Sequence, residues 1–157
     1  MTSDDLIKDT LQTSKIIAIV GASVPKENES VSKMRLKPSI IVMKYLLEFG
    51  YKVIPVNPFS VGKKVNGETI VEKLEDISSQ IDIVNVFRPS KETPDIAKKA
   101  IKVGAKTLWL QFGIQNNEAE KISKSAGLTC IMNKCIKQEY QRLFLKMKPV
   151  FPVLLNN

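Results

Sequence analysis

The stretch IIAIVGASVPKENESVSKMRLKPSI, residues 16–40, decides the fold. It opens with a short, β-branched apolar run, which is typical of a strand buried on both faces. Gly21 ends the run, as a glycine does where a phosphate-binding loop begins. A dinucleotide fingerprint needs further glycines close by, but the next one is Gly50. A long segment rich in Lys, Ser and Glu (22–36) comes instead, so the pattern does not fit a compact pyrophosphate loop.

Apolar runs alternate with amphipathic runs along the whole chain. The predicted strands are short and nearly continuous in hydrophobicity: Ile16–Val20, Lys52–Val56, Asp82–Phe87, Thr107–Gln111 and Leu128–Met132. The predicted helices are Ser3–Gln12, Ser39–Phe49, Thr93–Val103, Asn116–Ala126 and Ile136 to about Met147. This order predicts an α/β fold: a Rossmann-like, doubly wound, five-stranded, mostly parallel sheet in three α/β/α layers.

Local signals refine two of these segments. Thr93 is the predicted N-cap of its helix, with Pro94 in the first turn and Gly104 after the end. The connection between the second and third strands is irregular. Within it, Asn66-Gly67 predicts a tight turn, and one short helical turn is expected near Val71–Leu74.

The chain of 157 residues predicts a single domain over 1–157, with its core at about 14–145 and an apolar tail at 148–157. No apolar run approaches the ~20 residues of a membrane span. The first residues are acidic and lack the basic start of a secretory signal. The two cysteines are too few for a disulfide framework. We therefore expect a cytoplasmic protein that does not bind membranes.

Charge and histidine content narrow the function. The net charge is +8, which favours anionic partners, although a lysine-rich solvated surface explains scattered lysines equally well. Nucleic acid is not the expected partner, because no aromatic stacking array accompanies the charge. The chain has no histidine, which removes the usual general base and the Ser–His and Cys–His pairs. We expect no catalytic residues, no metal site and no enzymatic activity.

Ligands of open parallel sheets bind beyond the carboxyl ends of the strands. Each predicted strand is followed by small or polar residues: Gly21-Ala22-Ser23, Asn57-Pro58, Phe87-Arg88, Gln111-Phe112-Gly113-Ile114 and Asn133-Lys134-Cys135. Such residues at all five strand ends predict a binding site at this edge.

The same edge disfavours a nicotinamide cofactor. Enzymes that use NAD place an acid after the second strand to hold the ribose diol, whereas this chain has Asn57. The long first loop contributes further positive charge through Lys26, Lys33, Arg35 and Lys37. Pro38-Ser39 then begins a helix whose N-terminus favours an anion. A ligand with several phosphates fits this pattern best, and a Rossmann-type NAD(P)-dependent oxidoreductase is the alternative function.

Several segments, taken in order, resemble the stand-alone CoA-binding domain family, which is similar to the N-terminal domain of the succinyl-CoA synthetase alpha subunit. They are VGAS (20–23), KPS (37–39), VIPVNP (53–58), DIVNVFR (82–88), GAKTLWLQFG (104–113) and CIKQEY (135–140). The resemblance implies a nucleotide-binding fold that holds coenzyme A or an acyl-CoA as a non-catalytic binding or regulatory module. The chain departs from the family pattern at Lys37, Ile40 and Asn133, where arginine, an aromatic residue and an acid are common.

The resemblance also implies roles for individual residues. Gly21, Ala22 and Ser23 would line the nucleotide phosphates, and Lys37, Pro38 and Ser39 would meet phosphate at the helix start. Asn57 and Pro58 would flank the adenosine, and Phe87 and Arg88 would border the pocket. Gln111, Gly113 and Ile114 would follow the pantetheine arm, and Cys135 would lie near the mouth.

Two further expectations concern Cys135 and the assembly. A thiolate of Cys135 at a helix N-terminus would form a mixed disulfide with the CoA thiol, or else Cys135 is a small buried core residue. The apolar segment Val150–Leu155 is the expected interface, either of a homo-oligomer or with another protein.

Overall fold

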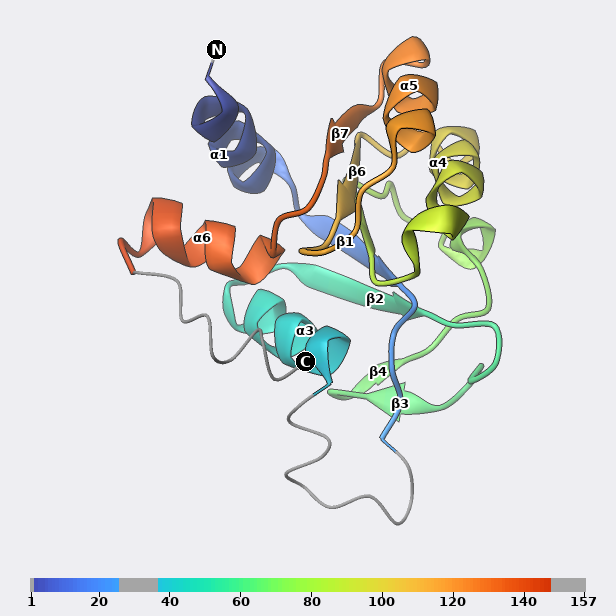
Figure 1. Ribbon diagram of the computed structural model, residues 1–157. Coiled ribbons are helices and arrows are strands. Elements are labelled where there is room, and N and C mark those ends of the chain that lie inside the picture. Colours follow the sequence, from blue (N-terminus) through green and yellow to red (C-terminus); the bar gives the residue numbers. More distant parts are fainter. Residues whose placement is uncertain (1, 26–36, 148–157) are drawn as a thin grey trace.

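The computed structural model describes residues 2–25 and 37–147 (Figure 1). Its centre is a parallel sheet of five strands in the order β2-β1-β5-β6-β7. The strands are β1 (Ile16–Val20), β2 (Lys52–Val56), β5 (Ile83–Val86), β6 (Thr107–Leu110) and β7 (Thr129–Ile131). β1 is paired in parallel with β2 on one side and with β5 on the other. The predicted α/β class and the five parallel strands are confirmed.

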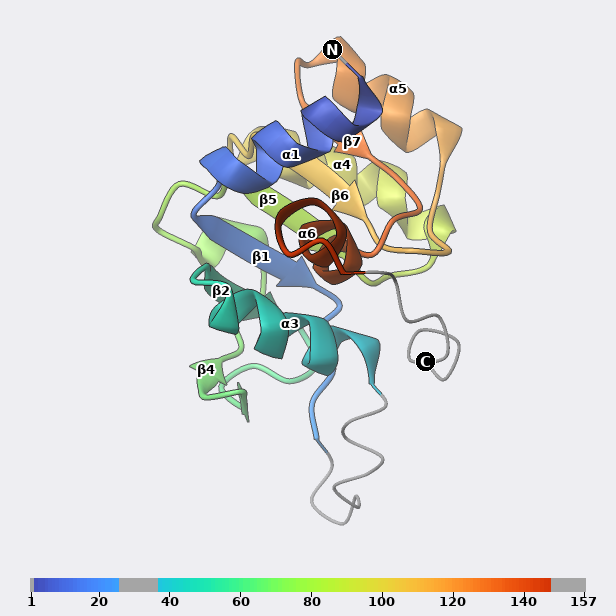
Figure 2. The ribbon, with the colours of Figure 1, turned by 90° about the vertical axis from the view of Figure 1, so that its left-hand side faces the viewer.

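Helices cover both faces of the sheet, as Figures 1 and 2 show. The helices are α1 (Ser3–Thr13), α3 (Pro38–Glu48), α4 (Thr93–Lys102), α5 (Asn117–Ser125) and α6 (Ile136–Phe144). Buried side chains of α1, α3 and α6 pack on one face of the sheet, and those of α4 and α5 pack on the other. This is the three-layer arrangement that the sequence predicts.

The start of α4 differs from the prediction. Thr93 is the first residue of the helix rather than its cap, and Glu92 precedes it without a capping side-chain bond. The hydroxyl of Thr93 instead donates to the carbonyl of Ser90, across a 3₁₀ turn that spans Ser90–Glu92. The reason is that this turn already bends the chain into helical geometry, so α4 begins without a polar cap. Glu92 thereby stands at the front of the helix.

The connection from β2 to β5 carries no α-helix anywhere between residues 57 and 82, all of which are described. It forms a small hairpin of β3 (Lys64–Val65) and β4 (Glu68–Thr69), followed by a 3₁₀ turn at Leu74–Asp76. The hairpin turns at Asn66 and Gly67, whose φ angles of 50° and 82° are those of a tight left-handed turn, as predicted. The helical turn lies a few residues after the predicted place. The hairpin and the 3₁₀ turn therefore form a thin connection in place of a crossover helix between β2 and β5.

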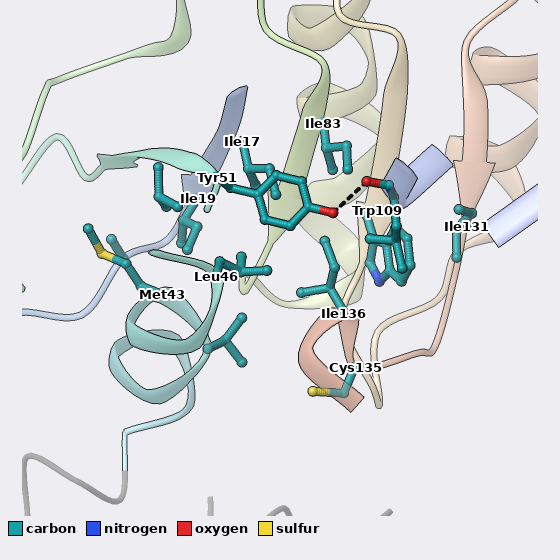
Figure 3. Close-up of a cluster of buried hydrophobic side chains, with 14 of the residues drawn as sticks. Ile17, Ile19, Met43, Leu46, Tyr51, Ile83, Trp109, Ile131, Cys135 and Ile136 are labelled. Atoms are coloured by element: carbon teal, nitrogen blue, oxygen red, sulfur yellow. Dashed lines mark hydrogen bonds between the residues drawn. The ribbon is translucent and has the colours of Figure 1, made fainter. Parts of the chain in front are cut away.

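The face covered by α1, α3 and α6 holds a closed apolar cluster, shown in Figure 3. Trp109 of β6 is fully buried there, and its indole N–H donates to the carbonyl of Lys134 over 2.8 Å. The hydroxyl of Tyr51 donates to the carbonyl of Leu11, and burial raises the pKa of Tyr51. These bonds satisfy the polar ends of the aromatic side chains and tie α1 and the start of α6 to the sheet.

In the described parts of the chain, every helix is too short or too polar to cross a membrane. The apolar tail at 148–157 lies outside the described residues.

Candidate functional site

A pocket of about 580 Å³ lies where the carboxyl ends of β1, β2 and β5 meet α4. β2 and β5 lie on opposite sides of β1 in the sheet. The chain therefore passes from β1 to one side of the sheet and from β2 to the other side, so the pocket lies at the topological switch point. The thin connection after β2 leaves the space open, and Glu72, Lys73 and Leu74 from this connection line one wall. The topology therefore explains both where the pocket lies and why the space is open.

Gly21 lies directly beneath the side chain of Arg88. Its φ of +87° is one that residues with a side chain rarely adopt, and a Cβ added there would lie 2.8 Å from Cδ of Arg88. Only glycine allows this close approach. The aliphatic part of Arg88 thus packs on the loop after β1, and both residues line the pocket.

Arg88 makes a bidentate ion pair with Glu92, four residues further along the chain. Its Nε donates to Oε1 over 3.1 Å, and its Nη2 donates to Oε2 over 2.8 Å. This hydrogen-bonded pair lowers the pKa of Glu92 and raises the pKa of Arg88. Both side chains are partly exposed, at 45% and 39%, and both face the pocket.

Among the described residues, the charges that line the pocket balance. Three cationic and three acidic side chains contribute: Lys73, Arg88, Lys99, Glu72, Glu92 and Asp95. Lys99 is paired with Asp95 over 3.3 Å, in the same i, i+4 relation as Arg88 with Glu92. The described lining therefore carries no excess of positive charge.

The end of β2 contributes Asn57, Pro58 and Phe59 to the pocket. Both polar side-chain atoms of Asn57 are hydrogen-bonded within the protein. Its Nδ2 donates to the carbonyl of Ala22, and its Oδ1 accepts the N–H of Phe59, both over 2.9 Å. It thereby holds the loops after β1 and β2 together. Phe59 comes next, with its ring 90% exposed at the pocket. A large exposed aromatic side chain beside a pocket offers a stacking surface for a flat ring.

The backbone N–H groups of Gly21, Ala22 and Ser23, directly after β1, are already bonded within the protein. Those of Gly21 and Ala22 both donate to the carbonyl of Val56, and that of Ser23 donates to Oγ of Ser39 over 2.8 Å. The side chain of Lys37 donates to the carbonyl of Val24. These bonds hold the segment directly after β1 against the end of β2 and the start of α3. The predicted phosphate contacts of Gly21, Ala22, Ser23, Lys37, Pro38 and Ser39 stay predictions.

The predicted residues divide into three groups in space. Six of them line the pocket: Gly21, Ala22, Ser23, Asn57, Pro58 and Arg88. Lys37, Pro38 and Ser39 lie at the start of α3, and Ser39 touches the loop through Ser23. The other five lie outside the pocket lining: Phe87, Gln111, Gly113, Ile114 and Cys135. Lys26, Lys33 and Arg35 lie outside the described residues.

The residues outside the lining make contacts within the protein. Oε1 of buried Gln111 accepts the N–H of Ile136 over 3.0 Å and an N–H of Asn85 over 3.2 Å, so it joins β6 to the start of α6. The N–H of Gly113 donates to Oδ1 of Asn133. Cys135 is only 3% exposed and belongs to the apolar cluster. Their predicted contacts with the pantetheine arm and at the pocket mouth stay predictions.

Sequence reasoning missed the acidic side of the pocket and its exposed ring. Glu72, Glu92, Asp95 and Phe59 were not among the predicted site residues. The i, i+4 spacing of Arg88 with Glu92 and of Asp95 with Lys99 was a readable signal for two ion pairs. In residues 2–25 and 37–147, no three acidic or cysteine side chains are grouped so as to hold a metal ion.

The comparisons with known proteins agree with this fold. A sequence model of the CoA binding domain family matches residues 15–141. The uncharacterized protein YneT of Bacillus subtilis is 39% identical over 131 residues, which cover 83% of this chain and 89% of YneT. Among solved structures, a Thermus thermophilus protein superimposes with a TM-score of 0.79 at 34% identity, covering 91% of this chain and 100% of its own. A hypothetical protein from Pyrococcus horikoshii gives a TM-score of 0.77 at 39% identity, covering 90% and 92%.

Proposed function

This chain belongs to the CoA-binding domain family, and from that premise we propose that it binds coenzyme A or an acyl-CoA at the carboxyl ends of its parallel strands, as a binding or regulatory module without catalytic activity of its own. The observation that carries the location is the packing of Arg88 over Gly21 inside the pocket. A guanidinium on the glycine loop of a switch-point pocket is placed to meet phosphate.

The size and lining of the pocket support a nucleotide end. About 580 Å³ lies within the range of small-molecule sites, which is roughly 300–1,000 Å³. Phe59 offers a face for the adenine ring. The acid Glu72 is an acceptor for amino or hydroxyl groups, so the uncharged part of the ligand belongs on its side and the phosphates belong near Arg88.

A nicotinamide cofactor is the weaker candidate. The acid that would hold its ribose diol is replaced by Asn57, and both polar atoms of that amide are bonded within the protein. The choice between the two ligands is an experimental one.

Isothermal titration of the purified chain with CoA, acetyl-CoA and NADP tests the proposal. We expect saturable binding of CoA or acetyl-CoA, and no comparable binding of NADP. Arg88→Ala should weaken CoA binding by roughly tenfold or more, because a charge-assisted bond to phosphate is lost. The control is Lys98→Ala on α4, a cation that is absent from the pocket lining. Tighter binding of NADP than of CoA would reject the proposal.

The absence of catalysis is tested separately. Acyl-CoA incubated with the protein should release no free CoA thiol above the rate in buffer, as followed with a thiol-reactive dye. The support for this expectation is that the chain lacks histidine and that two of the three cations in the pocket are paired with carboxylates. Thiol release that scales with protein concentration would show an acyl-CoA hydrolase instead.

A homo-oligomer or a protein partner belongs to the same proposal, because a binding module without catalytic activity acts through the molecules that it contacts. Light scattering of the chain with and without residues 148–157 tests whether the tail forms the interface. Loss of a dimer in the shortened chain would support that role, and a monomer in both forms would exclude self-association.

A further inference from the structure

The ion pair between Arg88 and Glu92 leaves one edge of the guanidinium unused. Arginine has five N–H donors in a planar fork. Glu92 occupies the edge formed by Nε and Nη2, with bonds of 3.1 and 2.8 Å. Both hydrogens of Nη1 and one of Nη2 have no acceptor among the described residues. The paired edge is held by Glu92 at the end of the 3₁₀ turn before α4, and the remaining donors are left for a ligand in the pocket that both residues line.

The stem of Arg88 is held as well. Its Cδ and Cγ lie so close to Gly21 that a Cβ there would be 2.8 and 3.1 Å away. Packing on the glycine fixes the stem and the carboxylate fixes the head, although 45% of the side chain is exposed. An exposed arginine otherwise samples many rotamers, and fixing it only when the ligand arrives lowers affinity.

A second pair in the same pocket shows what an ordinary surface pair looks like. Asp95 and Lys99 are joined by one contact of 3.3 Å, and their side chains are 73% and 55% exposed. Lysine carries a compact charge on a flexible stem and has no fork to orient. Asp95 therefore contributes a negative charge to the pocket without orienting a planar group.

We propose that Glu92 is a positioning residue for ligand binding: it holds Arg88 over the glycine loop so that the free edge of the guanidinium meets a phosphate group of the ligand. This inference rests on the proposed CoA binding. It assigns to Glu92 the opposite effect from simple charge repulsion. A carboxylate that faces an anionic ligand normally weakens binding, whereas Glu92 strengthens binding because it prepares its partner.

The test compares Glu92→Gln with Asp95→Asn by titration with CoA. Each variant removes one negative charge from the same pocket. We expect Glu92→Gln to weaken CoA binding by roughly three- to tenfold, because the guanidinium loses its paired carboxylate. We expect Asp95→Asn to leave binding unchanged or to tighten it by about twofold, as a lost repulsion should. If both variants tighten binding alike, Glu92 acts as a repelling charge and the inference is wrong.

A double-mutant cycle isolates the route through Arg88. In the Arg88→Ala background, Glu92→Gln should no longer weaken binding, because there is no guanidinium left to position. An unchanged loss in that background would place the effect of Glu92 elsewhere and overturn the inference. Unfolding midpoints of all variants establish that each is folded at the titration temperature. Failure of the wild-type chain to bind CoA would instead reject the proposed function, so the two failures are distinguishable.

Discussion

The two faces of the sheet meet the same carboxyl edge in different ways. On the α4 side, the edge opens into a pocket, one wall of which is formed by Glu72, Lys73 and Leu74 from the connection after β2. On the α3 and α6 side, aromatic and aliphatic side chains close the edge, and Cys135 lies within them at the start of α6 (Figure 3). The difference shows that strand ends alone do not make a site. The segment after each strand, either a tightly packed helix or a thin connection, decides which ends are open.

On the face covered by α1, α3 and α6, Trp109→Ala should lower the free energy of unfolding by a large amount. It should not change the pocket on the other face. Trp109 is fully buried and bonded to the carbonyl of Lys134. Truncation of a buried tryptophan costs about 3–5 kcal/mol of unfolding free energy. Denaturant unfolding measures the loss, with Phe112→Ala as the control because Phe112 is 52% exposed on the same strand exit. A loss below about 1 kcal/mol would contradict the closed cluster.

If Trp109→Ala does not fold, Trp109→Phe keeps most of the apolar volume. It removes the indole N–H and leaves the carbonyl of Lys134 without that donor. We expect a smaller loss, of about 1–3 kcal/mol.

The open face should respond most strongly to Gly21→Ala. The substitution places a Cβ 2.8 Å from Cδ of Arg88 at a φ of +87°. We expect a loss of about 1–3 kcal/mol in unfolding free energy from the strained backbone, together with at least a roughly tenfold loss of CoA affinity from the displaced arginine. Denaturant unfolding and titration measure the two effects.

Gly67→Ala is the matched control for this substitution. Gly67 has a similar φ of +82°, but a Cβ there would meet no atom within 4 Å. It should share the backbone cost and keep CoA affinity. Equal affinity losses in the two variants would show that contact with Arg88 is irrelevant to binding.

The fold could be predicted because its signals are local. The runs Ile16–Val20 and Lys52–Val56 become β1 and β2 with the predicted bounds, because apolar β-branched residues fill a strand that is buried on both faces. Part of the site could be predicted too, because parallel strands bring their ends together at one edge. Glu92 and Phe59 were missed because their place depends on the 3₁₀ turn before α4 and on the loop after β2. Cys135 is buried in the apolar cluster, which was one of the two alternatives for this residue, and the sequence could not choose between them because burial depends on what the fold packs around the residue.

The exposed side chain of Phe59 should contribute to CoA binding and hardly at all to the stability of the protein. Base stacking on an aromatic side chain contributes about 1–3 kcal/mol, so Phe59→Ala should weaken CoA binding by roughly five- to a hundredfold. Because the ring is 90% exposed in the free protein, unfolding free energy should change by less than about 0.5 kcal/mol. Phe112→Ala serves as the control, since its ring is also exposed but lies outside the pocket lining. Equal affinities of the wild type and Phe59→Ala would remove the ring from the site.

The smallest effect is expected for Cys135, the residue for which the sequence raised a redox role. Cys135 is 3% exposed within the closed cluster, whereas Cys130 is less buried, and burial raises the pKa of the Cys130 thiol. Thiol exchange requires a thiolate that the disulfide can reach. We therefore expect intact-mass spectra of the folded protein with CoA disulfide to show little adduct, and those of the denatured protein to show adducts on both cysteines. A rapid adduct in the folded protein that Cys135→Ser abolishes would mean that α6 opens away from the sheet, and the two faces of the edge would then form one continuous site.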